Sequence, residues 1–275
     1  MTQSGEIHAT AVVDSGAVLG RGVTVGPFAY VAAGARIGEG CMIGPHATVY
    51  GCVDLGAGCR VHAGAVLGDV PQDVGFAGGE SGVRIGARCV LREGVTVHRG
   101  TKPGTMTTLG DDCFLMAFSH VAHNVTLASR VIMANGALLA GYVEVGERCF
   151  ISGNAVVHQF VRIGRLAMLG GGCGISKDVP PFCTMCPTAL NEVAGLNVVG
   201  MRRAGLSATD RQAVRQAFKV LYRSGLNVSQ AVAVLRERFT TGPAAELSAF
   251  AAASTRGLCA TARRAGAADD AGQGL

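Results

Sequence analysis

An aliphatic residue or methionine recurs at every sixth position over most of the chain. The recurrence runs unbroken over positions 7–67, resumes in the same phase at 85–97, and holds again over 109–175. Four residues after each of these positions stands a small or short side chain, and glycine often follows the aliphatic residue. Each hexad therefore predicts one short strand and a turn. Three hexads predict one coil of a parallel β solenoid whose aliphatic columns are buried.

Two segments break the six-residue pattern, 68–84 and 102–108. The first is rich in Gly, Pro, Gln and Asp, and the second is rich in Gly, Pro and Thr. We expect them to loop out of the solenoid, where functional residues are often carried. The hexads stop after Pro180-Pro181.

Helical signals follow the end of the hexads. Ser207 and Asp210 stand at the N-cap and capping-box positions of a predicted helix over 211–223, and further helices are expected over 228–239 and 244–254. These signals divide the chain into a solenoid domain and a C-terminal α-helical domain with a tail, which we expect to be disordered because it is rich in Ala and Gly. Their predicted bounds are 1–185, 190–260 and 261–275.

Composition agrees with a β-rich repeat protein, because 41 Gly, no Trp and only 16% charged residues suit tight turns around small side chains. Among ten cysteines, six occupy the small inward position of a hexad, where we expect buried, inert thiols. Neither a signal peptide nor a long apolar run is present, which predicts a cytoplasmic protein without a membrane span. The net charge of +5 favours an acidic partner and argues against nucleic acid.

Three histidines carry the strongest chemical signal. His123 lies two positions after its aliphatic residue, and the same position holds Gly141 one coil later and Gln159 two coils later. A general base would therefore lie about 4.8 Å from a backbone N–H without a side chain, which suits a tetrahedral oxyanion. His120 and His158 add imidazoles nearby. Alternatively, these histidines decorate solvent-facing turns, or join a histidine of a neighbouring subunit in a metal site.

The hexads resemble those of the bacterial hexapeptide acyltransferases over about residues 7–180. That resemblance implies an all-β left-handed parallel β-helix and a homotrimer, since periodicity alone does not give the hand of the coil. Further motifs resemble the family of UDP-N-acetylglucosamine acyltransferases, which open lipid A biosynthesis. They are Pro71-Gln-Asp73, His120-Val-Ala-His123, Ala140-Gly141, Val157-His-Gln-Phe160, Lys177-Asp-Val-Pro-Pro181, Gly195–Arg203 and Ser254-Thr-Arg-Gly-Leu258.

The resemblance implies a role for each matching residue. His123 would take the proton from the sugar 3-hydroxyl, the N–H of Gly141 would stabilise the oxyanion, and His120 and His158 would contact the substrate. The sugar and nucleotide would be held by Gln159, Asp73, Asn197 and Arg203. The implied acyl donor is acyl carrier protein, and the implied reaction needs no metal, cofactor or covalent intermediate because the thioester is already activated.

Five departures from the best-known members leave the acceptor atom open. Asn124 replaces an Asp, Tyr142 a His, Gly75 a Lys, Val199 a Glu and Ala204 an Arg. Several of these variants also resemble members that prefer a 3-amino sugar. We therefore expect O-acylation of UDP-N-acetylglucosamine, with N-acylation of its 3-amino analogue as the alternative. A metal-dependent hydratase of the γ-carbonic-anhydrase type and a non-catalytic scaffold are more remote alternatives.

Gly171 matches a position where a bulky residue in some members of the family blocks the acyl groove. It stands in the run Gly170-Gly171-Gly172. An open groove predicts a preference for 3-hydroxyacyl chains of roughly 12–14 carbons, because each further buried methylene adds binding free energy.

Overall fold

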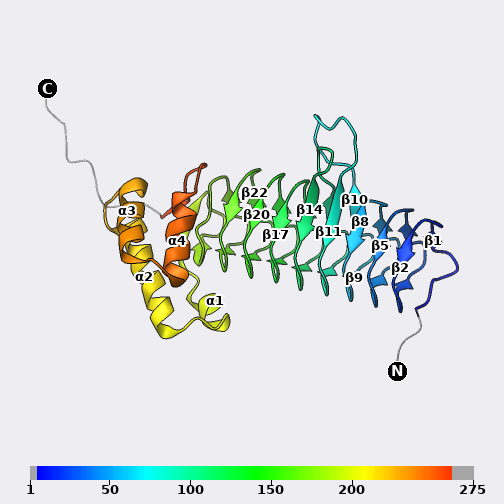
Figure 1. Cartoon of the computed structure of the whole chain (residues 1–275), viewed down its shortest axis with the longest axis horizontal. Helices are drawn as coiled ribbons and strands as arrows, with labels where there is room; N and C mark the ends of the chain where they lie inside the picture. Colours follow the sequence, from blue (N-terminus) through cyan, green and yellow to red (C-terminus); the bar gives the residue numbers. More distant parts are fainter. Residues whose placement is uncertain (1–4, 262–275) are drawn as a thin grey trace.

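The computed structural model describes residues 5–261 and forms a long left-handed β-helix capped by helices at its C-terminal end. Three strands make each coil, and successive coils stack with parallel strands into three sheets (Figure 1). The predicted fold class is confirmed. The predicted tail at 262–275 lies outside the described residues.

Within residues 5–261 the three sheets hold nine, eight and eleven strands. The nine-stranded sheet contains β1 (Val12–Val13), β4 (Tyr30–Val31), β7 (Thr48–Val49), β10 (Val66–Asp69), β13 (Thr96–His98), β16 (His120–Val121), β19 (Leu138–Leu139), β22 (Val156–Val157) and β25 (Gly174–Ile175). The eight-stranded sheet contains β2 (Val18–Leu19), β5 (Arg36–Ile37), β8 (Val53–Leu55), β11 (Gly82–Ile85), β14 (Met106–Leu109), β17 (Thr126–Leu127), β20 (Glu144–Val145) and β23 (Arg162–Ile163). The eleven-stranded sheet contains β3 (Thr24–Val25), β6 (Met42–Ile43), β9 (Arg60–Val61), β12 (Val90–Leu91), β15 (Phe114–Leu115), β18 (Ile132–Met133), β21 (Phe150–Ile151), β24 (Met168–Leu169), β26 (Cys183–Met185), β27 (Glu192–Leu196) and β28 (Ala260–Thr261).

The interior of the β-helix is built from the two inward positions of every hexad. All aliphatic positions of the repeat from Val25 to Ile175 are buried. Ile7, at the N-terminal end of the described β-helix, is 51% exposed. The six cysteines at the small position are buried and free, as predicted, and thiols such as Cys41 donate to a backbone carbonyl of the next coil. The aliphatic columns thus form one continuous core.

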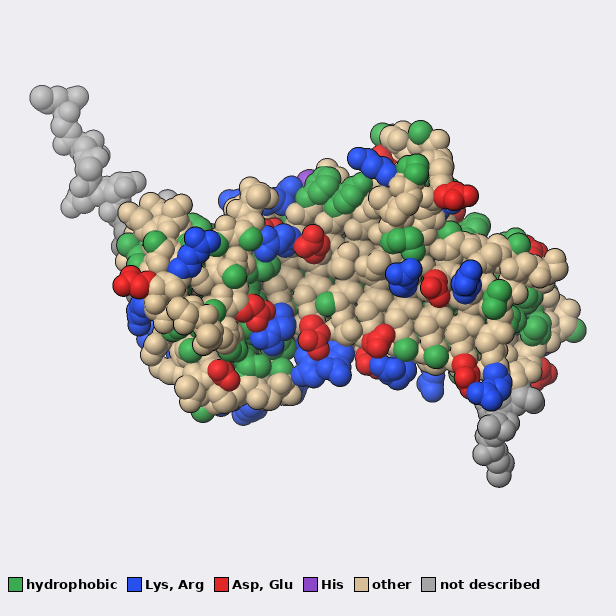
Figure 2. Space-filling view, viewed as in Figure 1, with side chains coloured by type: hydrophobic (Ala, Val, Ile, Leu, Met, Phe, Trp, Pro, Cys, Tyr) green, Lys and Arg blue, Asp and Glu red, His purple; other side chains and the backbone are tan. Residues whose placement is uncertain are grey.

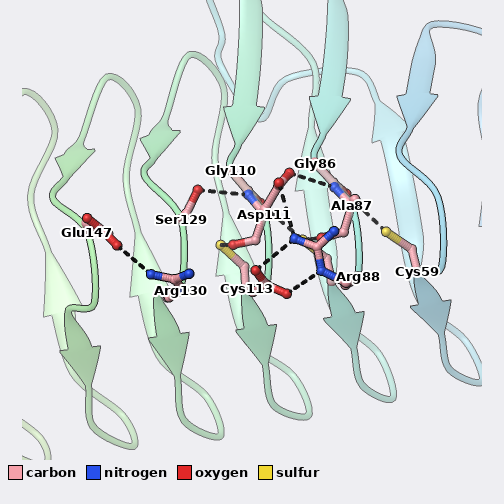
Figure 3. A network of polar contacts seen from close by, with 12 residues as sticks. Cys59, Gly86, Ala87, Arg88, Gly110, Asp111, Cys113, Ser129, Arg130 and Glu147 are labelled. Carbon is pink, nitrogen blue, oxygen red and sulfur yellow. Dashed lines mark hydrogen bonds and ion pairs between the residues drawn. The ribbon is translucent and has the colours of Figure 1, made fainter. Parts of the chain in front are cut away.

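One edge of the β-helix carries a ladder of paired charges between successive coils (Figure 3). Arg88 pairs with Asp112 at 2.7 Å and with Asp111 at 3.3 Å, and Arg130 pairs with Glu147 at 3.1 Å. These side chains are exposed, so each pair adds little stability. Because the charges compensate one another, this edge offers no strong field to a charged substrate.

The two interruptions of the repeat form neighbouring loops that project from one side of the β-helix (Figure 1). Both loops are shorter than the sequence predicts. Strand β10 continues to Asp69 and β11 already begins at Gly82, which shortens the first loop, and β14 begins at Met106, which shortens the second. Pairing of β11 with its neighbours on both sides satisfies the backbone there. The N–H of Gly104 donates to the carbonyl of Glu80 at 2.7 Å, which ties the loops together.

The C-terminal region contains four helices within the described residues, α1 (Val198–Arg203), α2 (Ala208–Arg223), α3 (Val228–Arg238) and α4 (Gly242–Ala252). The side chain of Ser207 accepts from the N–H of Asp210, as expected of the N-cap. The helix signals in the sequence do not mark α1. The hexad pattern likewise does not indicate that β27 and β28 extend the eleven-stranded sheet, with β27 antiparallel to β26. Across residues 5–261 none of the helices has the length and apolar character of a membrane span.

Candidate active site

His123 lies in a turn between the nine- and eight-stranded sheets, directly after β16. His123 is buried, with 8% of its surface exposed. The ring packs on Gly141 of the next coil so closely that an added Cβ there would lie 2.5 Å from Nε2 and 2.9 Å from Nδ1. Any side chain at residue 141 would therefore displace the imidazole. The predicted neighbourhood of these two residues is present in the fold.

The amide of Asn124 fixes the tautomer of His123. Oδ1 of Asn124 accepts from the backbone N–H and from Oγ1 of Thr101, each at 3.0 Å, which identifies this amide atom as the oxygen. The same oxygen lies 3.1 Å from Nδ1 of His123. Because an amide oxygen only accepts, Nδ1 carries the proton. Nε2 is then left with its lone pair, as a general base requires.

The first loop brings a carboxylate to the other ring nitrogen. Oδ2 of Asp73 lies 3.9 Å from Nε2 of His123, and Oδ1 accepts from the N–H of Gly75 at 2.9 Å. This turn directs the carboxylate of Asp73 toward His123, but at 3.9 Å the two groups form no short hydrogen bond, so Nε2 stays available. A sugar hydroxyl between the two groups would meet an acceptor on either side.

Gly141 also has a backbone N–H without a hydrogen-bond acceptor among residues 5–261, whereas its neighbours Ala140 and Tyr142 donate to Val157 and His123. Turn positions of this type leave one N–H free. Here the free N–H lies beside a base, which is the combination that stabilises an oxyanion during acyl transfer.

Two further histidines, His98 and His120, lie near the base. His120 accepts or donates through Nδ1 to Oγ1 of Thr96 at 2.7 Å, and its ring stands edge-on to that of His98 at 4.9 Å. Burial, with smaller contributions from His98 and His123, lowers the pKa of His120 to about 4. Burial likewise lowers the pKa of His98. Both rings therefore stay neutral near pH 7, which limits the positive charge beside His123.

Aromatic rings flank the base on the outer side. Tyr142 stands edge-on to His123 at 5.3 Å and stacks on Phe160 at 4.8 Å, and its hydroxyl lies 2.9 Å from Oγ1 of Thr101. Gln159 and His158, one coil beyond Gly141, are exposed. The edge of the β-helix thus continues beyond Gly141 with exposed side chains. On the face drawn in Figure 2, basic and acidic side chains are interspersed along the β-helix.

The glycines at 170–172 differ in why they lack side chains. A Cβ on Gly170 would lie 2.5 Å from the backbone nitrogen of Pro187, and Gly172 has a positive φ of 64°. A Cβ on Gly171 would meet only the carbonyl oxygen of Gly153, at 3.7 Å. The fold therefore requires glycine at 170 and favours it at 172, although Asn154 adopts the same positive φ one coil earlier, whereas residue 171 has room for a side chain.

Asn197 and Arg203, predicted to bind the nucleotide, lie at the two ends of α1, whereas His123 follows β16 within the β-helix. Oδ1 of Asn197 caps this helix at the N–H of Gly200, and Nδ2 donates to the carbonyl of Leu166 at 2.9 Å. The amide is therefore engaged within its own chain. Arg203 is exposed and forms no ion pair within residues 5–261.

Two residues that sequence analysis missed complete the site. Thr101 holds Asn124 and Tyr142 in place, and His98 backs His120 with an Nδ1 that has no partner among the described residues. His98 follows the aliphatic Val97 of the preceding coil, and this position in the repeat is the signal that marks it. Over the same residues, no cluster of three or more His, Cys, Asp or Glu is arranged to hold a metal ion.

The fold and the histidine-bearing turn define a hexapeptide-repeat transferase. The family model of bacterial transferase hexapeptide repeats matches residues 34–69 and 106–141. A model described as UDP-N-acetylglucosamine O-acyltransferase, domain 2, matches residues 178–259. The chain belongs to the family of acyl-[acyl-carrier-protein]–UDP-N-acetylglucosamine O-acyltransferases.

This membership rests on similarity to curated relatives and solved structures, several of which match nearly the whole chain. The family member from Alkalilimnicola ehrlichii is 48% identical over 254 residues, which cover 92% of this chain and 98% of that one. The member from Synechocystis is 47% identical over 173 residues, which are 63% of this chain and 62% of that protein. The crystal structure of the Francisella novicida UDP-N-acetylglucosamine acyltransferase superposes with a TM-score of 0.89, at 30% identity, over 93% of this chain and 94% of that one.

Proposed function

We propose that this protein transfers a 3-hydroxyacyl group from acyl carrier protein to the 3-hydroxyl of UDP-N-acetylglucosamine, the first step of lipid A biosynthesis. The observation that carries the proposal is the arrangement of His123. Its Nδ1 donates to Oδ1 of Asn124, and its ring, with the unprotonated Nε2, packs against Gly141. The names of the relatives support the choice of both substrates.

In this mechanism Nε2 of His123 removes the proton of the sugar 3-hydroxyl as the oxygen attacks the thioester carbon. The carbonyl oxygen becomes an oxyanion, which the free N–H of Gly141 stabilises. The tetrahedral intermediate then collapses by breaking the carbon–sulfur bond, and the imidazolium returns the proton to the departing thiolate of the carrier protein. An ester and a free carrier thiol result, with no acyl group left on the enzyme.

N-acylation of the 3-amino analogue is the second candidate, because Gly75 stands where the best-known members have a Lys and resembles members that prefer a 3-amino sugar. Purified protein given both UDP-sugars at equal concentration tests the choice. We expect the alkali-labile ester to form faster than the alkali-stable amide. An amide as the main product would transfer the proposal to the amino sugar, and no product with either sugar would contradict the proposed function.

We also propose that the protein acts in the cytoplasm as a homotrimer with sites between subunits. Support comes from the outward side of the nine-stranded sheet, where Leu138 and Val156 on adjacent strands are 42% and 46% exposed. Neighbouring apolar side chains of this kind are typical of surfaces that bind another chain.

Light scattering should accordingly give three times the 28.0 kDa mass of one chain. Replacing Leu138 and Val156 together by Lys should shift the mass toward that of one chain, because two charges would enter the buried interface. The matched control is the pair Thr126→Lys and Glu144→Lys on adjacent strands of the eight-stranded sheet, which should leave the mass unchanged. A single-chain mass for the wild type would contradict the proposed trimer.

Gly171 supports a proposal on acyl-chain length, because residue 171 has room that the fold itself does not use. We expect the wild type to prefer roughly 12–14 carbons, and Gly171→Met to move the preference toward about 10 carbons by filling the end of the groove. Gly171→Ala should produce a smaller shift in the same direction. Competition among 3-hydroxyacyl carrier proteins of different length measures the profile, and an unchanged profile in Gly171→Met would contradict this assignment.

A further inference from the structure

The chain returns to the β-helix after its last helix, and a buried carboxyl group fixes it there. Asp178 is 1% exposed. Its Oδ2 accepts from Oγ of Ser254 at 2.9 Å, its N–H donates to the carbonyl of Gly257 at 2.9 Å, and its carbonyl accepts from the N–H of Cys259 at 2.9 Å. Three hydrogen bonds around one buried residue hold the segment from Ser254 to Cys259 in a single position.

This segment places Arg256 on the same edge of the β-helix as the base. Its guanidinium donates to the carbonyl of Ser176 at 3.1 and 3.3 Å, and Nη2 lies 3.3 Å from Nδ1 of His158. A guanidinium can only donate hydrogen bonds, so Nδ1 of His158 accepts and the ring proton is on Nε2. The 3.2 Å approach of Nδ1 to the carbonyl of Gln159 is then not a hydrogen bond.

Arg256 and His158 together present hydrogen-bond donors and a positive charge to a ligand. Arg256 keeps N–H groups beyond those used on Ser176, and His158 keeps its Nε2–H on the exposed side. Neither Arg256 nor the neighbouring Lys177 has a carboxylate within 4.0 Å among residues 5–261. Asp178, the acid that this segment packs on, accepts from the N–H of Arg162 with one carboxyl oxygen and from the hydroxyl of Ser254 with the other. A positively charged site whose free groups are hydrogen-bond donors fits a phosphate group, because the phosphate oxygens are negatively charged acceptors.

The distance to the base fits the substrates. Val157, next to His158, is paired through β19 with Val121 of the strand that precedes His123, so the two histidines lie two coils apart. Two strand spacings are about 10 Å. A substrate with its reacting atom at His123 and a phosphate about 10 Å away would reach Arg256. Both proposed substrates have a phosphate beyond the reacting group: the diphosphate of the UDP-sugar and the phosphodiester of the carrier's phosphopantetheine.

We propose that Arg256, together with His158, binds a substrate phosphate and so positions the reacting group at His123. This inference rests on the proposed function and extends it to a residue outside the site described above. The site belongs to the segment that returns from the helical region, so it couples the docking of that region to substrate binding.

The test is Arg256→Gln, because glutamine keeps a donor for the carbonyl of Ser176 while removing the charge. We expect the KM of the substrate whose phosphate is bound to rise roughly ten- to a hundredfold, the range for a hydrogen bond to a charged group, with kcat nearly unchanged. Arg256→Lys should recover part of the loss. Arg236→Gln, an exposed arginine on α3, is the matched control and should behave like the wild type.

Calorimetric titrations with small probes identify the phosphate and do not depend on turnover. If Arg256→Gln weakens binding of UDP, the diphosphate is the ligand. If it instead abolishes the preference for 3-hydroxyacyl-phosphopantetheine over 3-hydroxyacyl-pantetheine, the phosphodiester is the ligand. Either result supports the inference. Unchanged affinity for both probes, with a variant that stays folded, overturns it, whereas absence of acyl transfer in the wild type would contradict the proposed function alone.

Discussion

Replacing His123 by alanine is expected to lower kcat by roughly 10²–10⁴, the usual contribution of a general base. Neither neighbour replaces the base. His120 is buried, bonded to Thr96 and held neutral with a pKa of about 4. The carboxylate of Asp73 lies 3.9 Å from Nε2 of His123, but a carboxylate is intrinsically a weaker base than an imidazole. Substrate KM should change little, since the ring of His123 is mostly covered and the binding groups lie elsewhere.

Steady-state rates and oligomer size must be measured on the same preparation. His46→Ala is a suitable control, because this histidine stacks on Phe28 in the N-terminal coils and lies outside the proposed site. It should retain wild-type turnover. A His123→Ala protein of native size that keeps more than about a tenth of wild-type turnover would refute the assignment of the base.

Gly141→Ala should lower kcat by roughly 10²-fold, although alanine keeps the backbone N–H proposed for the oxyanion. The loss comes from the base. A methyl group within 2.5 to 2.9 Å of the ring nitrogens of His123 must push the imidazole away from Asn124 and out of line with the sugar. Rates measured at saturating concentrations of both substrates isolate this effect on kcat.

Gly171→Ala provides the matched comparison for this variant. It makes the same chemical change in a turn of the same β-helix, but its new Cβ makes an ordinary contact at 3.7 Å. We expect it to keep wild-type kcat with its preferred donor. Equal rates for Gly141→Ala and Gly171→Ala would mean that the close packing of Gly141 on His123 has no role in catalysis.

The sequence predicted the β-helix well because the six-residue repeat specifies both buried columns at once. A buried aliphatic position such as Leu139 is followed by the turn that contains Gly141, so the register that buries the core also brings residue 141 beside His123. In a repeat protein this contact between coils follows from the sequence pattern, since an uninterrupted coil is three hexads long.

Contacts that depend on the insertions were not predictable in the same way. Thr101 lies where the second loop leaves the repeat, and no spacing rule reveals that its N–H and hydroxyl reach Asn124. No spacing rule reveals that the amide of Asn197, expected to bind a nucleotide, also caps α1 and bonds to Leu166. Arg256 reaches His158 from almost a hundred residues further along the chain, through a fold of the helical region that sequence periodicity does not describe.

The most direct test of the account follows a labelled 3-hydroxyacyl group through a single turnover. The label starts on acyl carrier protein, enzyme is added in excess, UDP-N-acetylglucosamine follows, and samples are quenched and separated into protein-bound and sugar-bound label. Direct transfer with His123 as base predicts that the label stays on the carrier until the sugar arrives and then appears as the sugar ester, without passing through the enzyme. Label held covalently by the enzyme before the sugar is added, or sugar ester formed equally fast by His123→Ala, would contradict it.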